Sequence, residues 1–342
     1  MSNIAVRVEQ APQVLEEQHD HAHNEHAHGH GHHGPANLHH HFTDLAQQRE
    51  SNALGMWVFL VTEVMTFGAL FFVYTLYRHL FENQNHLLSQ NGVTWLSPWG
   101  VGSHLLDNSL GFINTLVLLC SSLTVATAVF MAGIKQRKWL VGMLSLTAFL
   151  GATFLGIKSV EWYHDYQEKI VPGLNWEPRN TLARKGFLLA TPTGVNGEGY
   201  IPGPNPTTFK NAETQWQQVY EQAEAEEAGG AGGSEPGFSA AQQGASAESR
   251  GQHDVKFQGV INGLQLQMFF VIYFCMTGLH AIHMIIGLGL ISVFLFHARR
   301  GMFTESPNDQ PVEIFGLYWH FVDIVWVFLY PLLYLVTLPV RH

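Results

Sequence analysis

Long apolar stretches alternate with polar segments along the whole chain. Five stretches are predominantly apolar, and each has about twenty residues or more, enough to cross the roughly 30 Å hydrocarbon core of a membrane as a helix. The chain is therefore predicted to be all-α, an integral membrane helical bundle with five transmembrane helices. The five predicted spans are residues 53–77, 112–134, 139–163, 266–296 and 314–338.

The polar segments divide the chain into four predicted parts. Two parts form the membrane bundle: residues 51–165 hold spans one to three, and residues 259–342 hold spans four and five. Residues 1–50 are predicted to be a disordered, His-rich cytoplasmic tail. Residues 166–258 form a Pro/Gly/Ala-rich insertion, which is too long for an ordinary connection between two helices.

Two connections are expected to lack regular structure. Residues 78–107 carry Pro98, Gly100 and Gly102, and we expect a loop between spans one and two. Within the insertion, residues 221–249 consist mainly of Ala, Gly, Glu and Gln, a composition typical of flexible segments.

Basic residues predict the orientation of the bundle. Lys and Arg cluster in two short turns, residues 135–138 after span two and residues 299–300 after span four. The positive-inside rule places these turns and the N-terminus in the cytoplasm, and the insertion and the C-terminus on the extracytoplasmic side. The insertion has eleven acidic and seven basic residues between Glu168 and Lys256, so it would present a mildly acidic outer surface.

Charge, cysteine content and the N-terminus narrow the possible functions. The formal net charge is −10, and only 13% of the residues are charged, so nothing in this balance suggests nucleic-acid binding. Cys120 and Cys275 both lie in apolar stretches, which predicts neither a disulfide framework nor a cysteine metal motif. The N-terminus lacks the basic and apolar regions of a secretory signal, so membrane insertion is expected to begin at span one.

Three carboxylic side chains lie within the predicted spans: Glu63, Glu161 and Asp323. A charge that faces lipid is costly, so each side chain is expected to face protein or a water-filled cavity. Two interpretations of Glu63, near the centre of span one, stay open. It is either a neutral hydrogen-bond donor between helices or a proton-accessible site. Several carboxyl groups in one bundle favour a polar interior or a proton path.

Histidines in spans four and five form a second set of candidates. His280 and His283 lie on one face of span four, and His320 and Asp323 lie on one face of span five. Imidazoles ligate haem iron and transition metals, but two histidines on one face of a single helix do not form a bis-His haem site. A transported-metal site is the alternative, and hydrogen bonds between helices or to lipid head groups are favoured.

The N-terminal tail could also bind metal ions. Between residues 19 and 41, eleven of twenty-three positions are histidine. Clustered imidazoles bind Zn, Cu or Ni in a pH-dependent way, but the spacing defines no single coordination sphere. A solvated tail with incidental metal affinity is therefore the favoured interpretation. The candidate weak sites are His26, His28, His30, His32 and His33.

Motifs in all five spans resemble one known family. They are residues 55–65 (GMWVFLVTEVM), Asn114 with Thr115, residues 157–163 (IKSVEWY), residues 277–287 (TGLHAIHMIIG) and residues 318–326 (YWHFVDIVW). On these motifs the chain resembles subunit III of haem-copper terminal oxidases, cytochrome c oxidases in particular, in its five-span bacterial form. The tail and most of the insertion lie outside the resemblance.

The resemblance implies a non-catalytic subunit without a redox centre. In that family, haem and copper reside in subunits I and II, which reduce O2 to water in a proton-pumping complex. Subunit III stabilises subunit I, binds phospholipid and supports proton uptake. The implied location is the bacterial inner membrane, with subunit I, subunit II and phospholipid as partners in aerobic respiration.

The resemblance also assigns expected roles to single residues. Glu63 matches the family's carbodiimide-reactive intramembrane glutamate. The chain lacks the first two of the seven spans of larger members, which build the far wall of the lipid cleft. Contact of residues 166–258 with subunit II, cytochrome c or another respiratory complex is a hypothesis from their length and charge. Candidates for lipid or interhelix contacts are His280, His283, Glu313, Trp319, His320 and Trp326.

Three alternative functions stay open at this point. Two belong to related complexes: subunit III of a quinol oxidase, and an accessory subunit of a nitric oxide reductase. The third is a metal transporter, which would explain both the His-rich tail and the intramembrane His and Asp residues.

Overall fold

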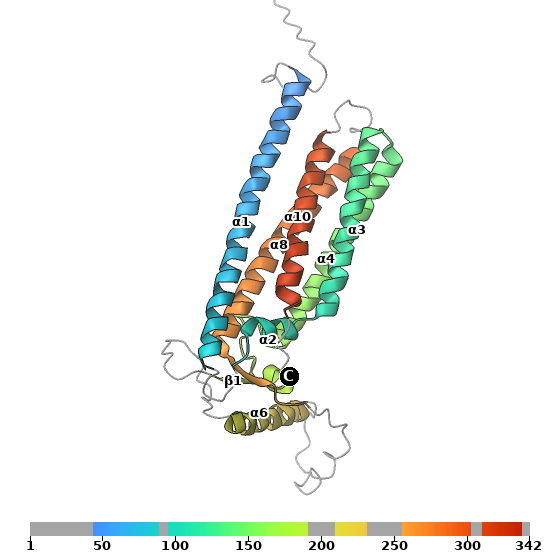
Figure 1. The fold of residues 1–342 in the computed structure, drawn as a ribbon. Coiled ribbons are helices and arrows are strands. Elements are labelled where there is room, and N and C mark those ends of the chain that lie inside the picture. Colours follow the sequence, from blue (N-terminus) through green and yellow to red (C-terminus); the bar gives the residue numbers. More distant parts are fainter. Residues whose placement is uncertain (1–43, 89–94, 191–208, 231–254, 302–309, 337–342) are drawn as a thin grey trace, which may run out of the picture.

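The computed structural model describes residues 44–88, 95–190, 209–230, 255–301 and 310–336. Five helices in these ranges are long and apolar enough to cross a membrane, which confirms the predicted helical bundle (Figure 1). Helix α1 extends beyond the predicted span at both ends. The five helices are α1 (Leu45–Leu88), α3 (Asn108–Gly133), α4 (Arg137–Gln167), α8 (Gly263–Arg299) and α10 (Gln310–Tyr334).

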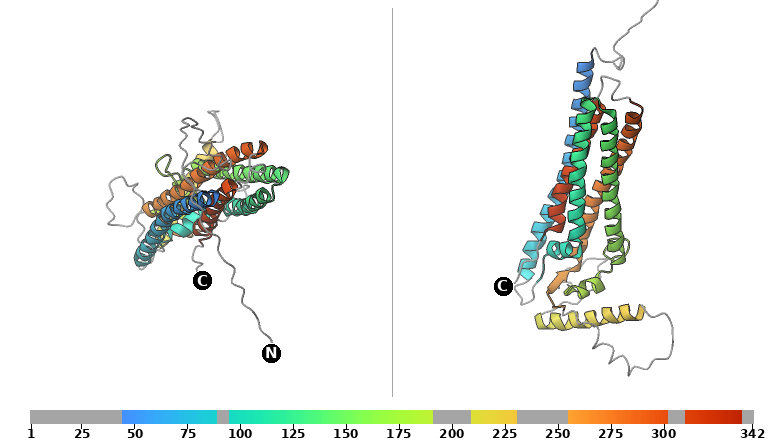
Figure 2. Two further views of the ribbon diagram at one scale, coloured as in Figure 1. Left: turned by 90° about the horizontal axis from the view of Figure 1, so that it is seen from above. Right: turned by 90° about the vertical axis from the view of Figure 1, so that its right-hand side faces the viewer.

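Helix α10 occupies the centre of the bundle. It contacts α1, α3 and α8, and Figure 2, seen from above, shows it between α1 and the pair α3 and α4. Of its most apolar window, 61% is buried, compared with 11% for α1. Trp319 and Trp326 are fully buried on α10, so this helix supplies two of the three fully buried tryptophans of the described chain. The outer face of α1, in contrast, has no cover within the described chain.

Small residues allow the tryptophans of α10 to enter the bundle. A Cβ atom added at Gly287 of α8 would lie 2.8 Å from Cζ3 of Trp319, and one at Gly151 of α4 would lie 2.9 Å from Cη2 of the same ring. Glycine at helix contacts lets side chains and backbones approach closely. The two glycines therefore form the space that the indole of Trp319 fills.

Side chains from other helices complete the C-terminal end of α10. The last carbonyl groups of a helix have no partner within it. The hydroxyl of Tyr74 donates a hydrogen bond to the carbonyl of Leu332, and the hydroxyl of Ser103 donates one to the carbonyl of Tyr334 at 2.8 Å. The end of α10 is thereby fixed to α1 and to the segment before α3.

The described residues between 78 and 107 are mostly helical, whereas a loop was expected. Helix α1 continues well into this segment, and α2 (Pro98–Leu105) covers one end of the bundle. Proline fits the first turn of a helix because its missing N–H has no intrahelical acceptor there. Trp99 is fully buried and packs edge-on against Tyr74 and Phe269. The loop prediction was wrong because burial of this apolar turn outweighs the effect of its proline and glycines.

Part of the long insertion is folded. Strands β1 and β2 pair in parallel, with Phe187 opposite Gly259 and Ala190 opposite Asn262. Parallel strands require a crossover connection, and α6, which follows β1, packs on both strands and lies across the end of the bundle (Figure 1, Figure 2). The elements are α5 (Arg179–Arg184), β1 (Phe187–Ala190), α6 (Phe209–Gly230) and β2 (Gly259–Asn262).

Helix α6 has one buried face. Ala212, Trp216, Val219 and Ala223 are buried at helical spacing, and Nε1 of Trp216 donates a hydrogen bond of 2.9 Å to the carbonyl of Ala183. The expected flexibility of residues 221–249 is therefore wrong as far as Gly230, where α6 ends. The remaining residues of that stretch lie outside the described ranges.

Candidate functional site

The first candidate site joins α1 to α8. Nε2 of His283 lies 3.0 Å from Oε2 of Glu63, and the two side chains are only 10% and 20% exposed. Phe67 packs against the His283 ring, with 5.4 Å between the ring centroids. Glu63 and His283, which are far apart in the sequence, are thus direct partners, and an aromatic ring shields their contact.

The hydrogen bond of the second ring nitrogen of His283 restricts the protonation states that the Glu63–His283 pair can adopt. Nδ1 lies 2.8 Å from the carbonyl oxygen of Leu279, and a carbonyl can only accept, so Nδ1 carries a hydrogen. Nε2 then either accepts a hydrogen bond from protonated Glu63 or, as imidazolium, donates one to the Glu63 carboxylate. In both forms the pair holds one proton in this contact. That proton can shift between the two residues without a change in net charge.

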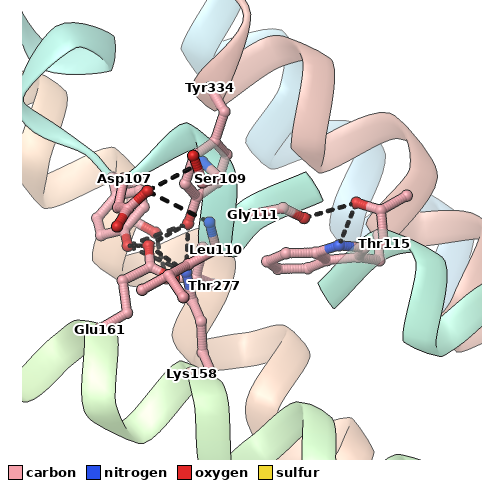
Figure 3. Close-up of polar contacts among 11 residues, drawn as sticks. Asp107, Ser109, Leu110, Gly111, Thr115, Lys158, Glu161, Thr277 and Tyr334 are labelled. Atoms are coloured by element: carbon pink, nitrogen blue, oxygen red, sulfur yellow. Dashed lines mark hydrogen bonds and ion pairs between the residues drawn. The ribbon is translucent and has the colours of Figure 1, made fainter. Parts of the chain in front are cut away.

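The second candidate site lies between α4, α8 and α10. Lys158 and Glu161 are each 2% exposed, and Nζ of Lys158 lies 3.0 Å from Oε1 of Glu161. Nζ also donates hydrogen bonds to the hydroxyl groups of Tyr273, at 3.0 Å, and Tyr334. Both hydroxyl groups in turn donate to Oε1 of Glu161. Figure 3 shows Lys158 and Glu161 extending from α4 toward Tyr334.

This arrangement compensates the charge of Lys158. A buried ion pair is stable only when further hydrogen bonds satisfy both groups. The ammonium has three acceptors, and its Nζ also lies 5.0 to 5.2 Å from the ring centroids of Tyr273, Tyr334 and Trp326, within the range of cation–π attraction. The hydrogen bonds and ring contacts of Lys158 therefore hold α4, α8 and α10 together.

Asp323 and His280 are buried without comparable partners. They are 3% and 1% exposed. The hydroxyl of Ser122 is the hydrogen-bonding group beside Asp323, and among the described residues no hydrogen bond reaches the ring nitrogens of His280. The His280 ring packs against Phe154 and Trp326, at 5.5 and 5.1 Å between centroids. His280 thus adjoins the tryptophan that also faces Lys158, while its neighbour His283 faces Glu63.

The remaining candidates lie on α10. Trp319, Trp326 and His320 all contact hydroxyl groups of α3, whereas Glu313 is exposed in the first turn. These contacts connect the two helices over about two turns, residues 115–122 of α3 and 319–326 of α10. They are Trp319 Nε1 to Ser121 Oγ at 2.9 Å, Trp326 Nε1 to Thr115 Oγ1 at 3.1 Å, and His320 Nδ1 with Ser122 Oγ at 2.7 Å.

The described residues do not form a metal centre. No group of three or more His, Cys, Asp or Glu side chains in this part of the chain could hold a metal ion. His283 and His320 contact different helices, α1 and α3. The tail residues considered as weak metal sites, His26, His28, His30, His32 and His33, lie outside the described ranges.

Sequence reasoning did not identify Lys158, Tyr273 and Tyr334 as site residues. A signal for Lys158 was present, because a lysine within an apolar span needs a partner, and Glu161 follows three residues later. The tyrosines gave no comparable signal, since they belong to spans that are distant in sequence and tyrosine is common in membrane helices.

The fold and these contacts define a multi-pass helical membrane protein whose spans are joined by buried polar groups. A family model described as cytochrome c oxidase subunit III matches residues 33–169 and 263–337, which include all five spans. The chain belongs to the cytochrome c oxidase subunit III family.

Curated relatives carry corresponding names. The chain is 36% identical over 75 residues to cytochrome c oxidase subunit 3 of Thermostichus vulcanus, which covers 22% of this chain and 37% of the relative. It is 22% identical over 283 residues to haem-copper oxidase subunit I+III of Aeropyrum pernix, and this match covers 82% of the chain and 22% of the relative. It is 22% identical over 293 residues to a probable cytochrome c oxidase subunit 3 of Rickettsia felis, and this match covers 84% of the chain and 69% of the relative. The matches thus span well under two thirds of the first two relatives.

Proposed function

We propose that the chain is a non-catalytic subunit of a proton-pumping haem-copper terminal oxidase, most plainly a cytochrome c oxidase. The observation that supports this proposal is the family match over both membrane parts, residues 33–169 and 263–337. In such a complex, subunits I and II hold haem and copper and reduce O2 to water. This chain stabilises subunit I and supports proton uptake.

The exposed face of α1 supports a partner inside the membrane. Trp57, Val61 and Phe72 are 57%, 55% and 67% exposed, and a face this apolar must be covered by lipid or by another protein. Subunits I and III are named as parts of one protein in the Aeropyrum pernix relative. That name favours subunit I as the protein partner, with phospholipid acyl chains over the apolar surface that it leaves open.

The contact between Glu63 and His283 supports the role in proton uptake. The pair holds one proton at the contact of Oε2 with Nε2, at 3.0 Å. It lies between α1 and α8, with the two side chains 10% and 20% exposed. We infer that this proton store sustains delivery of protons to subunit I and prolongs the working life of the complex. Glu161 and Asp323 lie buried in the interior of the same bundle.

The proposed location is a bacterial inner membrane, with the N-terminus and the turn around Gln136 in the cytoplasm and α6 outside. Labelling with a membrane-impermeant maleimide tests this orientation. A variant without Cys120 and Cys275, carrying Glu227→Cys on α6, should react in intact cells. A matched variant with Gln136→Cys should react only after the cells are broken, and the reverse pattern would refute the orientation.

The folded part of the insertion is proposed to contact a basic soluble partner such as cytochrome c. Glu221 and Glu224 are exposed on α6, and opposite charge steers association most strongly at low ionic strength. Glu221→Lys should therefore raise the apparent KM for a basic electron donor at low salt and change it less at high salt. An unchanged KM at both salt concentrations would exclude this surface of α6 from donor binding.

Affinity purification of the tagged chain in mild detergent tests the whole proposal. We expect haem-bearing subunit I and subunit II to accompany it, with an oxidase spectrum in visible light and oxygen consumption. The identity of subunit II reveals whether the electron donor is cytochrome c or quinol. If the complex reduces nitric oxide and consumes no oxygen, the chain is instead an accessory subunit of a nitric oxide reductase. A colourless chain that purifies alone with bound zinc or copper would favour metal transport instead.

A further inference from the structure

Three carboxylic side chains form a stripe along the end of α4. Glu161, Asp165 and Glu168 follow each other at spacings of four and three residues, so they share one helical face. Glu161 and Asp165 are 2% and 3% exposed, whereas the side chain of Glu168 is 22% exposed. The stripe therefore leads from the interior of the bundle to the end that carries the insertion.

The inner carboxyl group of the stripe has several hydrogen-bond donors and a lysine beside it. Oε1 of Glu161 accepts hydrogen bonds from Lys158 and from two tyrosine hydroxyl groups. Its other oxygen, Oε2, has no hydrogen-bond partner among the described residues. The ammonium of Lys158, 3.0 Å away, supplies the balancing positive charge.

The outer carboxyl group also has a cation nearby. Nζ of Lys185 lies 3.9 Å from Oε2 of Glu168, and this pair is partly open to water. His104 lies near Lys185, but burial and then the charge of Lys185 lower the pKa of His104. The imidazole of His104 is therefore neutral near pH 7. A second imidazole, that of exposed His164, lies beside Glu168, with its Nε2 3.8 Å from Oε1.

Asp165, in the middle, lacks a cation of its own. The charged groups that act on it are Lys158, Glu161 and Glu168 from α4 and its end, and Lys185 from the segment after α5. The polar groups facing it from α8 and α10 are the hydroxyl groups of Tyr273 and Tyr334.

Three acids thus share two lysines, and each lysine is engaged with another carboxyl group. Among the described residues, no ion pair includes Asp165, and its Oδ2 atom has no hydrogen-bond partner although it is fully buried. An unpaired charge at such a position is costly, and a proton that neutralises the group removes that cost. Oε2 of Glu161 and Oε2 of Glu168 are also buried without a hydrogen-bond partner, but each of these carboxyl groups has a lysine beside it. The missing cation at Asp165, together with its unpartnered oxygen, therefore indicates a bound proton.

We propose that Asp165 binds an exchangeable proton and that Glu168 relays this proton between Asp165 and water at the insertion-bearing end of the bundle. On release, the O–H bond of Asp165 breaks and the carboxylate of Glu168 takes up the proton, which then passes to water. Asp165 is left as a carboxylate, and uptake follows the same steps in reverse. This proton site is separate from the Glu63–His283 pair and does not depend on the proposed oxidase function.

Infrared spectroscopy of the full chain, purified in mild detergent with its partner subunits, tests this inference. A protonated carboxyl group has a C=O stretching band that moves to lower frequency in D2O. The difference between wild type and Asp165→Asn should contain one such band. Glu168→Gln should retain the band but slow its deuterium shift several-fold. Glu313→Gln, which changes an exposed acid on α10, should alter neither the band nor its exchange.

Three results would overturn the inference. A band that disappears in Glu161→Gln and persists in Asp165→Asn would place the proton on Glu161, and absence of any band sensitive to Asp165 would show that Asp165 is ionised. Exchange at the wild-type rate in Glu168→Gln would exclude the relay. Should Asp165→Asn fail to fold, Asp165→Glu serves instead, because it must shift the frequency of the band, and an unshifted band contradicts the assignment.

Discussion

Nε2 of His283 lies 3.0 Å from Oε2 of Glu63 and connects α8 to α1 near the middle of both helices. Helix α1 buries little of its apolar surface in the bundle, so polar contacts contribute to positioning it. They include this pair and the hydrogen bond from Tyr74 to the carbonyl of Leu332. Because Nδ1 of His283 is engaged by the carbonyl of Leu279, the contact with Glu63 is also the place where this part of the bundle can hold a proton.

Glu63→Gln should leave assembly of the complex intact and impair its proton chemistry. Glutamine keeps the size and a hydrogen bond to His283 but cannot release a proton. We expect altered proton uptake or a shorter lifetime during turnover, measured as oxygen consumption and proton release by purified complex in vesicles. Glu82→Gln, on an exposed part of α1, is the control. Wild-type turnover, pumping and inactivation in Glu63→Gln would rule out the functional role of Glu63.

Lys158→Met should destabilise the bundle by about 3–5 kcal/mol, because it leaves Glu161 as an unpaired buried charge. Thermal unfolding in detergent measures the loss, and Lys158→Met/Glu161→Gln should recover much of it because no charge then stays behind. Lys169→Met is the control, since its partner Glu177 lies 2.7 Å away but both side chains are more than half exposed. A double variant no more stable than Lys158→Met would show that the ion pair is not the source of the effect.

Gly287→Ala should destabilise the contact between α8 and α10. The new methyl group would lie 2.8 Å from Trp319, and overpacking of this kind costs about 1–3 kcal/mol. Gly289→Ala, two residues along the same helix, meets no atom within 4 Å and should cause no loss. Melting temperatures of the two variants in the same detergent provide the comparison, and equal values would mean that the ring of Trp319 moves aside at no cost.

Trp216→Ala should loosen α6 without affecting the membrane bundle. Replacing a buried tryptophan by alanine removes about 3–5 kcal/mol of packing, and here it also removes the hydrogen bond to Ala183. Hydrogen exchange followed by mass spectrometry should show faster exchange in α6 and unchanged exchange in α3 and α4. Gln217→Ala alters an exposed neighbour and serves as the control. Slow exchange in α6 of Trp216→Ala would mean that other contacts hold this helix.

The five spans were predictable because membrane insertion depends on local composition. The predicted span 112–134 lies within a few residues of α3, which the side chain of Asp107 caps by accepting hydrogen bonds from Ser109 and Leu110. Folded elements outside the membrane were harder to recognise. The helical spacing of Ala212, Trp216 and Val219 was visible in the sequence, but the glycines and glutamates that follow it, in residues 221–249, predicted a flexible segment.

The pairing of polar groups could not be predicted. The spans are apolar on nearly all sides, so the sequence pattern does not reveal which face of each helix points inward. Lys158 and Tyr334 are separated by 176 residues, and Glu63 and His283 by 220. Their contacts depend on the rotation and depth of each helix, which packing around Trp319 and Trp326 determines.

The parallel pairing of β1 with β2 has a practical consequence for engineering this protein. Ala190, where the chain leaves β1, and Gly259, where it enters β2, lie at opposite ends of a four-residue ladder, a separation of about 10 Å. Helix α6 lies within the connection that covers this distance and packs on both strands, so it should be kept. A fluorescent or affinity module could instead be inserted between Gly230 and Val255, while α4, α6 and α8 keep their places. The two paired strands would thus hold a grafted domain close to one end of the membrane bundle.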